Sequence, residues 1–164
     1  MLDHLAALAR YNRWMNEKLF AVASELSDEE RKRDLGAYFG SVHRTLGHIL
    51  LADRIWLGRL GAGPAVQPKS MGDELFADFM ELREARAETD DAIDAYVAQL
   101  DEAELAAPVA YARGGSPIEH PLWYAVVHLF NHQTHHRGQV TTLLMQLGRD
   151  PGVTDLIALL RTKN

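Results

Sequence analysis

The sequence predicts an all-α fold, a bundle of four long helices with a short additional helix near the C-terminal end. Apolar residues recur at spacings of three and four in four long segments, which is the period of one helix face. Glycine and proline separate these segments, so the helices have defined ends. No internal repeat or low-complexity segment interrupts the pattern, and we expect one domain over residues 1–164.

The first expected helix runs from near the N-terminus to about Leu26. Its apolar face comprises Leu5, Leu8, Met15, Leu19, Val22 and Leu26. Asn12 interrupts this row; it could line a cavity, but a lone polar residue in a bundle core more often fixes the register between helices. The sequence Ser-Asp-Glu-Glu at Ser27–Glu30 is typical of a capping box, so a short further helical turn should follow.

The second expected helix follows Gly36 and Gly40 and ends at Gly61–Pro64. Its apolar face comprises Val42, Leu46, Ile49, Trp56 and Leu60. The third is expected to open at Ser70–Asp73 and to end before Pro108. Its apolar residues are Leu75, Phe79, Leu82, Ile93, Tyr96 and Leu100.

An irregular loop or small hairpin is expected from Pro108 to Pro121, because glycine, serine and proline separate short apolar pieces there. The fourth helix should hold Pro121 in its first turn and run to Leu147, since Gly148 follows. A last short helix should begin near Thr154. It would carry Leu156, Ile157, Leu159 and Leu160.

The composition suits a globular protein and excludes several functions. Hydrophobic residues make up 47% and charged residues 24%, unlike a disordered chain. The net charge of -6 offers no basic surface for nucleic acid, and no apolar run approaches the roughly 20 residues that span a bilayer. The chain has no cysteine, so any metal must be held by nitrogen or oxygen, and we expect a cytoplasmic protein.

Two histidines interrupt the apolar row of the fourth helix. That row is Leu122, Ala125, Leu129, His132, His136, Val140, Leu143 and Leu147. Because His132 and His136 are four residues apart, their imidazoles can converge on one point, which we place in the bundle interior. A mainly polar neighbouring row leaves His128 and His135 at the edge of the stripe.

A metal site needs a third ligand, and His48 is the best candidate for it. It lies on the second helix in a row with small residues that leave room for a cavity, whereas His43 falls on another side. The competing interpretation is that His132 and His136 are neutral core histidines with hydrogen-bond partners. No Glu lies three residues before a His, so the ligands of a ferritin-like di-iron site are missing.

Other polar and aromatic residues have a structural interpretation beside a functional one. Asp53 lies too far around its helix to support His48, so we expect a buried ion pair or a contact with another helix. Trp14, Trp56 and Trp123 could wall a ligand pocket, but large aromatic residues at helical spacing usually fill a core or an interface. His128, His135 and His43 could each act as a general base, although surface or supporting positions are commoner.

Four segments together resemble the DinB family. They are His128–Gln139 (HLFNHQTHHRGQ), Leu46–Trp56 (LGHILLADRIW), Tyr11–Trp14 (YNRW) and Asp150–Gly152 (DPG). The resemblance spans nearly the whole chain. It implies a four-helix up-down-down-up bundle, frequent homodimers and a three-histidine metal centre whose ligands correspond to His48, His132 and His136.

Three neutral imidazoles would leave a divalent metal with its charge and with an open position for water or substrate. Zinc or nickel is the expected metal, with iron or manganese as alternatives. The resemblance implies a metal-dependent enzyme acting on a small molecule, either a transferase or isomerase that uses a low-molecular-weight thiol or a hydrolase. The alternatives are a stress- or DNA-damage-associated metal-binding protein without turnover, and an interaction module that the metal stabilises.

Overall fold

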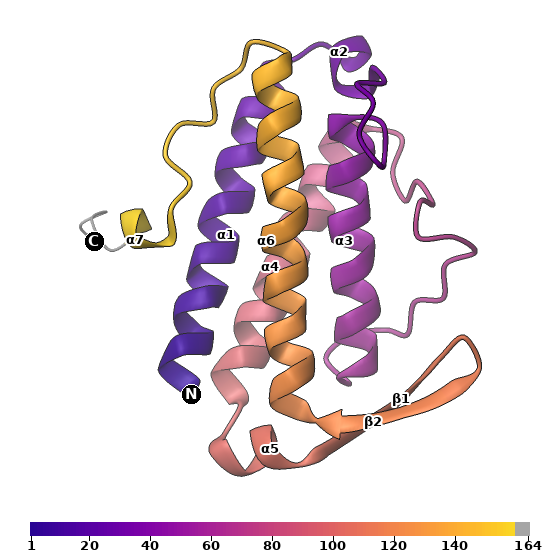
Figure 1. The fold of residues 1–164 in the computed structure, drawn as a ribbon, viewed down its shortest axis with the longest axis vertical. Coiled ribbons are helices and arrows are strands. Elements are labelled where there is room, and N and C mark those ends of the chain that lie inside the picture. The colour runs from indigo at the N-terminus through magenta and orange to yellow at the C-terminus, as the bar shows by residue number, and fades with distance from the viewer. Residues whose placement is uncertain (160–164) are drawn as a thin grey trace.

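The computed structural model describes residues 1–159 and confirms a predominantly helical fold (Figure 1). The elements in this range are α1 (Leu2–Ser24), α2 (Asp28–Lys32), α3 (Val42–Arg59), α4 (Phe79–Gln99), α5 (Glu102–Ala106), β1 (Pro108–Arg113), β2 (Ser116–Pro121), α6 (Leu122–Gln146) and α7 (Leu156–Leu159). No helix among these is long and apolar enough to cross a membrane.

The four long helices α1, α3, α4 and α6 lie side by side, and α2, α5 and the hairpin cover the two ends (Figure 1). Both α1 and α3 pack against α4 and α6. In the view of Figure 1, α1 and α6 run upward along the chain, whereas α3 and α4 run downward. The site described below lies where α3 meets α6.

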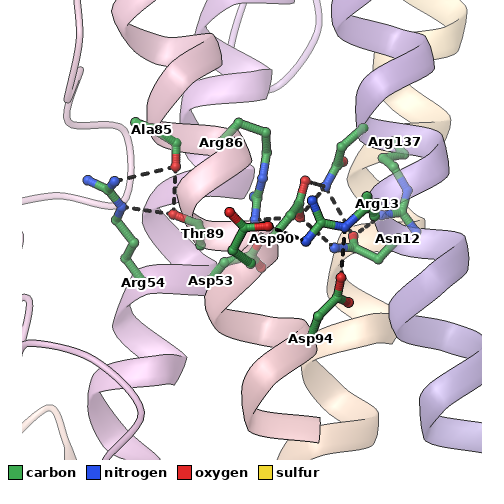
Figure 2. Close-up of polar contacts among 12 residues, drawn as sticks. Asn12, Arg13, Asp53, Arg54, Ala85, Arg86, Thr89, Asp90, Asp94 and Arg137 are labelled. Carbon is green, nitrogen blue, oxygen red and sulfur yellow. Dashed lines mark hydrogen bonds and ion pairs between the residues drawn. The ribbon is translucent and has the colours of Figure 1, made fainter. Parts of the chain in front are cut away.

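The core consists of two apolar clusters, one toward each end of the long helices. One cluster includes Met15 and Leu19 of α1 with Val140 and Leu144 of α6. The other includes Leu5 of α1 and residues near the start of α6. Between the clusters lies a layer of buried polar side chains, which we call the polar layer; Figure 2 shows the contacts of several of its members. Its members are Asn12, Asn16, Asp53, Arg86, Asp90, Gln133 and Arg137.

The third long helix begins later than the sequence analysis predicted. Helix α4 starts at Phe79 because the carboxylate of Asp78 accepts hydrogen bonds from the backbone N–H groups of Met80 (2.8 Å) and Glu81 (3.0 Å). The expected start at 70–73 is a turn instead, closed by the Asp73 carboxylate. Helix α4 ends at Gln99, before Pro108 as predicted.

A separate short helix, α5, which the sequence analysis did not predict, lies between α4 and Pro108. Asp101 and Glu104 form a second capping box, in which each side chain accepts a backbone N–H from the other residue. The capping box predicted at Ser27–Glu30 is confirmed at the start of α2. Both capping boxes follow a long helix, so each one begins a short helix that runs in a new direction.

The segment from Pro108 to Pro121 is a hairpin, one of the two predicted possibilities. Arg113 pairs with Ser116, and the two residues of the turn, Gly114 and Gly115, have φ values of 58° and 80°. This left-handed backbone favours glycine. The hairpin leads directly into α6, which begins after Pro121 and ends at Gln146, close to the predicted end. Of the residues expected in the last short helix, Leu160 lies outside the described residues.

Candidate metal centre

Helices α3 and α6 bring three histidines together. His48 is on α3, and His132 and His136 are one turn apart on α6. One ring nitrogen from each residue lies within 4.8 Å of the other two. His48 is buried, and His132 and His136 are half-buried. The three residues singled out from the sequence therefore share one position in the fold.

The spacing of the ring nitrogens suits a shared ion. The Nε2 atoms of His48 and His132 are 3.3 Å apart. Two nitrogens bound to a tetrahedral zinc at about 2.0–2.1 Å are separated by about 3.4 Å. All three ring nitrogens lie within 4.8 Å of one another, so a pair at that limit would have to close by about 1.4 Å to reach the tetrahedral separation.

Contacts outside the cluster orient two of the three rings. The Nδ1 of His48 lies 2.8 Å from the carbonyl oxygen of Met71, and the Nδ1 of His136 lies 2.8 Å from Oε1 of Gln139. Each oxygen accepts a hydrogen bond, so each neutral ring carries its proton on Nδ1 and leaves a lone pair on Nε2. Phe39 stacks on His48 with ring centroids 3.9 Å apart and covers that ring.

Burial keeps the cluster uncharged near neutral pH. Burial, together with the neighbouring His136 and His48, lowers the pKa of His132 to about 3. Burial also lowers the pKa values of His48 and His136, although the hydrogen bonds that these rings donate to the Met71 carbonyl and to Gln139 Oε1 oppose the effect. Neutral imidazoles are the form that coordinates a cation.

His132 differs from the other two rings. Its Nδ1 is buried and has no hydrogen-bond partner among residues 1–159. A metal-bound histidine ordinarily donates its second ring N–H to an acceptor that fixes the ring. The position of His132 therefore depends on packing and on its two histidine neighbours.

The remaining histidines of this region lie outside the cluster. His43 is buried on another side of α3, where its Nε2 contacts the carbonyl oxygen of Phe76 at 2.8 Å. His135 and His128 are exposed on α6, and their rings lie 4.7 Å from the His136 ring and 6.0 Å from the His132 ring. The sequence-based separation of these residues from the three central histidines is confirmed.

Two cavities flank the histidine cluster. One, of about 330 Å³, is lined in part by His135 and Gln139, and the other, of about 400 Å³, is lined in part by Phe39 and Met71. Tyr38 borders both and is 87% exposed. The cavities thus reach the residues that support His136 and His48, but the three histidines themselves line neither.

The polar layer lies beside the histidine cluster. The buried Arg86 forms ion pairs with Asp53 (2.5 Å) and Asp90 (2.9 Å), and Asn12 donates to Asp90 (2.9 Å), as Figure 2 shows. Arg137 donates to the side-chain oxygen of Asn12. The predicted structural role of Asn12 and the predicted ion pair of Asp53 are confirmed.

The rotation of α6 corrects one prediction. His132 and His136 lie at the edge of the core, whereas Gln133 and Arg137 point into it. The sequence held a signal for this arrangement, because a second row of six residues has the same spacing. That row is Val126, Phe130, Gln133, Arg137, Val140 and Leu144. The three tryptophans all pack against the apolar clusters, as expected.

Comparison with known proteins gives one consistent result. The model of the DinB family matches residues 1–163. Protein DinB of Bacillus subtilis (strain 168) is 26% identical over 160 residues, which cover 94% of this chain and 92% of that protein. The crystal structure of a DinB-like protein from Bacillus cereus ATCC 10987 superposes with a TM-score of 0.64 at 22% identity, covering 86% of this chain and 91% of that one.

Proposed function

The chain belongs to the DinB family, and on this basis we propose that His48, His132 and His136 hold one divalent transition metal. The observation that carries the proposal is the convergence of three neutral imidazoles within 4.8 Å. We further propose that α1, α3, α4 and α6 form the up-down-down-up bundle that the family resemblance implies, as one domain. Zinc or nickel is the proposed metal, because nitrogen ligands suit both.

We propose that the site is catalytic. A metal held by three histidines supplies a Lewis acid with an open position for water or substrate. The chain's own residues orient the ligands: Met71 holds the proton of His48 on Nδ1, and Gln139 does the same for His136. Phe39 shields the His48 ring from water.

The proposed reaction class is a metal-dependent transfer or isomerisation with a low-molecular-weight thiol, or a hydrolysis. The two flanking cavities give a small molecule access to the residues around the histidines. A soft thiolate binds well to a borderline metal such as zinc or nickel. A small polar substrate is therefore consistent with the space and the ligand set.

The second candidate is a stress- or DNA-damage-associated metal-binding protein without turnover. Two observations favour it. The histidines line neither of the two flanking cavities, and among residues 1–159 the Nδ1 of His132 has no partner that would fix its ring for catalysis.

Metal analysis of protein purified without an affinity tag tests the binding proposal. We expect about one metal per chain, and we expect His48→Ala, His132→Ala and His136→Ala each to lose most of it, because two ligands hold a divalent ion weakly. His135→Ala is the matched control, since this exposed residue adjoins His136 but lies outside the cluster. Full metal content in one of the three variants would remove that residue from the site.

Cobalt substitution separates the catalytic proposal from its alternative. Glutathione, bacillithiol or mycothiol should produce a sulfur-to-metal charge-transfer band if a thiol reaches the open position. If azide perturbs the spectrum and no thiol does, hydrolysis replaces thiol transfer. If neither reaches the metal, the protein without turnover is the correct assignment.

A further inference from the structure

A pocket of about 340 Å³ lies between α3 and α4, on a different side of α3 from the histidine cluster. This α3–α4 pocket is lined by Arg54, Leu57, Glu88, Thr89, Ala92 and part of the segment 62–66. The segment is held close to α3 at Gly58, where a Cβ atom would lie 2.8 Å from the carbonyl oxygen of Pro64. Glycine is therefore required for this close approach.

Two opposite charges border the pocket. The half-buried Arg54 donates from Nε to the hydroxyl of Thr89 (3.1 Å) and from Nη2 to the carbonyl oxygen of Ala85 (3.4 Å), as Figure 2 shows. Its ion pair with Glu88 is loose at 3.6 Å, and the Glu88 side chain is 75% exposed. An exposed ion pair of this kind contributes little energy, so a ligand can exchange with it.

The Arg54 guanidinium is half-buried, and burial disfavours its charged form. Burial lowers the pKa of Arg54, and the buried Arg86 acts in the same direction, while Glu88 opposes them. A further anion beside Arg54 would relieve part of this cost. The rest of the pocket is largely apolar, with Leu57, Val66 and Ala92 among its walls.

We propose that the α3–α4 pocket binds a free α-amino acid with an apolar side chain, such as leucine. Its carboxylate pairs with Arg54, its ammonium group pairs with Glu88, and its side chain packs against the apolar walls. An α-amino acid carries both charges on one carbon, so it can insert into the loose pair and contact both partners. A fatty acid bound to Arg54 would place its carboxylate beside the like-charged Glu88. An amine bound to Glu88 would place its ammonium group beside the like-charged Arg54.

Three probes of nearly the same shape test this assignment on the full chain. Leucine carries both charges, 4-methylpentanoate lacks the ammonium group and 3-methylbutylamine lacks the carboxylate. In calorimetric and NMR titrations we expect leucine to bind at least tenfold more tightly than either analogue, with amide shifts confined to α3, α4 and the segment 62–66. Equal binding of leucine and 4-methylpentanoate, or no binding of leucine, would overturn the proposal.

Substitutions test whether Arg54 binds the carboxylate of leucine and Glu88 its ammonium group. Arg54→Gln should abolish leucine binding, and Glu88→Gln should reduce the tenfold preference for leucine over 4-methylpentanoate to near unity. Because Glu88 is exposed, its variant should fold normally. Ala92→Leu should block the pocket, whereas Arg83→Gln, an exposed change outside it on the same helix, should leave leucine affinity unchanged. Unaltered leucine affinity in Glu88→Gln would refute the role of the ammonium group.

The proposal does not depend on the metal centre. Leucine binding should be the same in the wild-type protein and in His132→Ala, which removes a proposed metal ligand on α6. Loss of metal without loss of leucine binding would separate the two sites experimentally. Loss of leucine binding in a folded His132→Ala protein would show that the pocket is not the independent site proposed here.

Discussion

Arg86→Met should destabilise the protein severely, because it removes the cation of the polar layer. Arg86 is 3% exposed and lies between the carboxylates of Asp53 and Asp90, which are 1% and 3% exposed. Methionine replaces the aliphatic part of the side chain but none of its charge. The variant would therefore leave two buried carboxylates without their ion-pair partner.

The magnitude follows from what each carboxylate retains. Removing one partner of a buried ion pair costs about 3–5 kcal/mol. Asp90 would keep the amide donors of Asn12 and Asn16, each at 2.9 Å. Asp53 would lose the hydrogen bond from Arg86, and its Oδ1 already lacks a partner within the described part of the chain. We expect a loss of about 4 kcal/mol, a large fraction of the roughly 5–15 kcal/mol typical of folded proteins.

The loss should depend on pH. Burial already raises the pKa of Asp53 against the opposing effect of Arg86, and removing Arg86 would raise that pKa further. A carboxyl whose pKa is higher in the folded state binds more protons there than in the unfolded state. Stability then rises as pH falls. The deficit of Arg86→Met relative to wild type should therefore be smaller at pH 5 than at pH 8.

Urea denaturation at both pH values provides the measurement, with Arg13→Met as the matched control. Arg13 also pairs with two aspartates, Asp91 and Asp94, but at the surface. Exposed pairs contribute about 0–1 kcal/mol, so the control should change stability little. A loss below about 1.5 kcal/mol in Arg86→Met, or a deficit that grows as pH falls, would refute this account of the polar layer.

Two further predictions concern the metal centre and the assembly. Gln139→Leu should lower metal affinity about 10- to 100-fold without unfolding the protein, because it removes the acceptor at Nδ1 of His136. Competition with a chromophoric chelator measures this affinity, and an unchanged value would exclude Gln139 as a positioning residue. The chain should be a homodimer, as the family resemblance implies, and a monomer mass by light scattering at micromolar concentration would contradict that expectation.

The histidine pair shows what one sequence can predict about a site. The four-residue spacing of His132 and His136 places them on one helix face in any α-helix, so their convergence was predictable. The exact rotation of α6 was not, because two rows with the same spacing compete for the core. Gln133 and Arg137 occupy it, and Arg137 does so with a buried partner on another helix, Asn12, which cannot be read from the spacing within α6.

The start of α4 shows a different limit. Ser70, Asp73 and Asp78 can all cap a helix, and the apolar residues continue back to Leu75, so the pattern extends beyond the real helix. The carboxylate of Asp73 closes a turn, and that of Asp78 caps the helix. The sequence also contains the capping box of α5, formed by Asp101 and Glu104. It was not recognised as a helix start, because the apolar residues up to Leu100 predict one long helix in this region.

The polar layer and the histidine cluster are consequences of the same helix rotation. Each histidine directly precedes a residue of the polar layer, His132 before Gln133 and His136 before Arg137, about 100° around the helix. Arg137 donates to Asn12 on α1, so the contact that turns Arg137 toward α1 also turns His136 toward α3. In the sequence, each of the two metal-ligand candidates of α6 is followed directly by a polar residue of the core. When Gln133 and Arg137 are buried in the core, His132 and His136 therefore face His48.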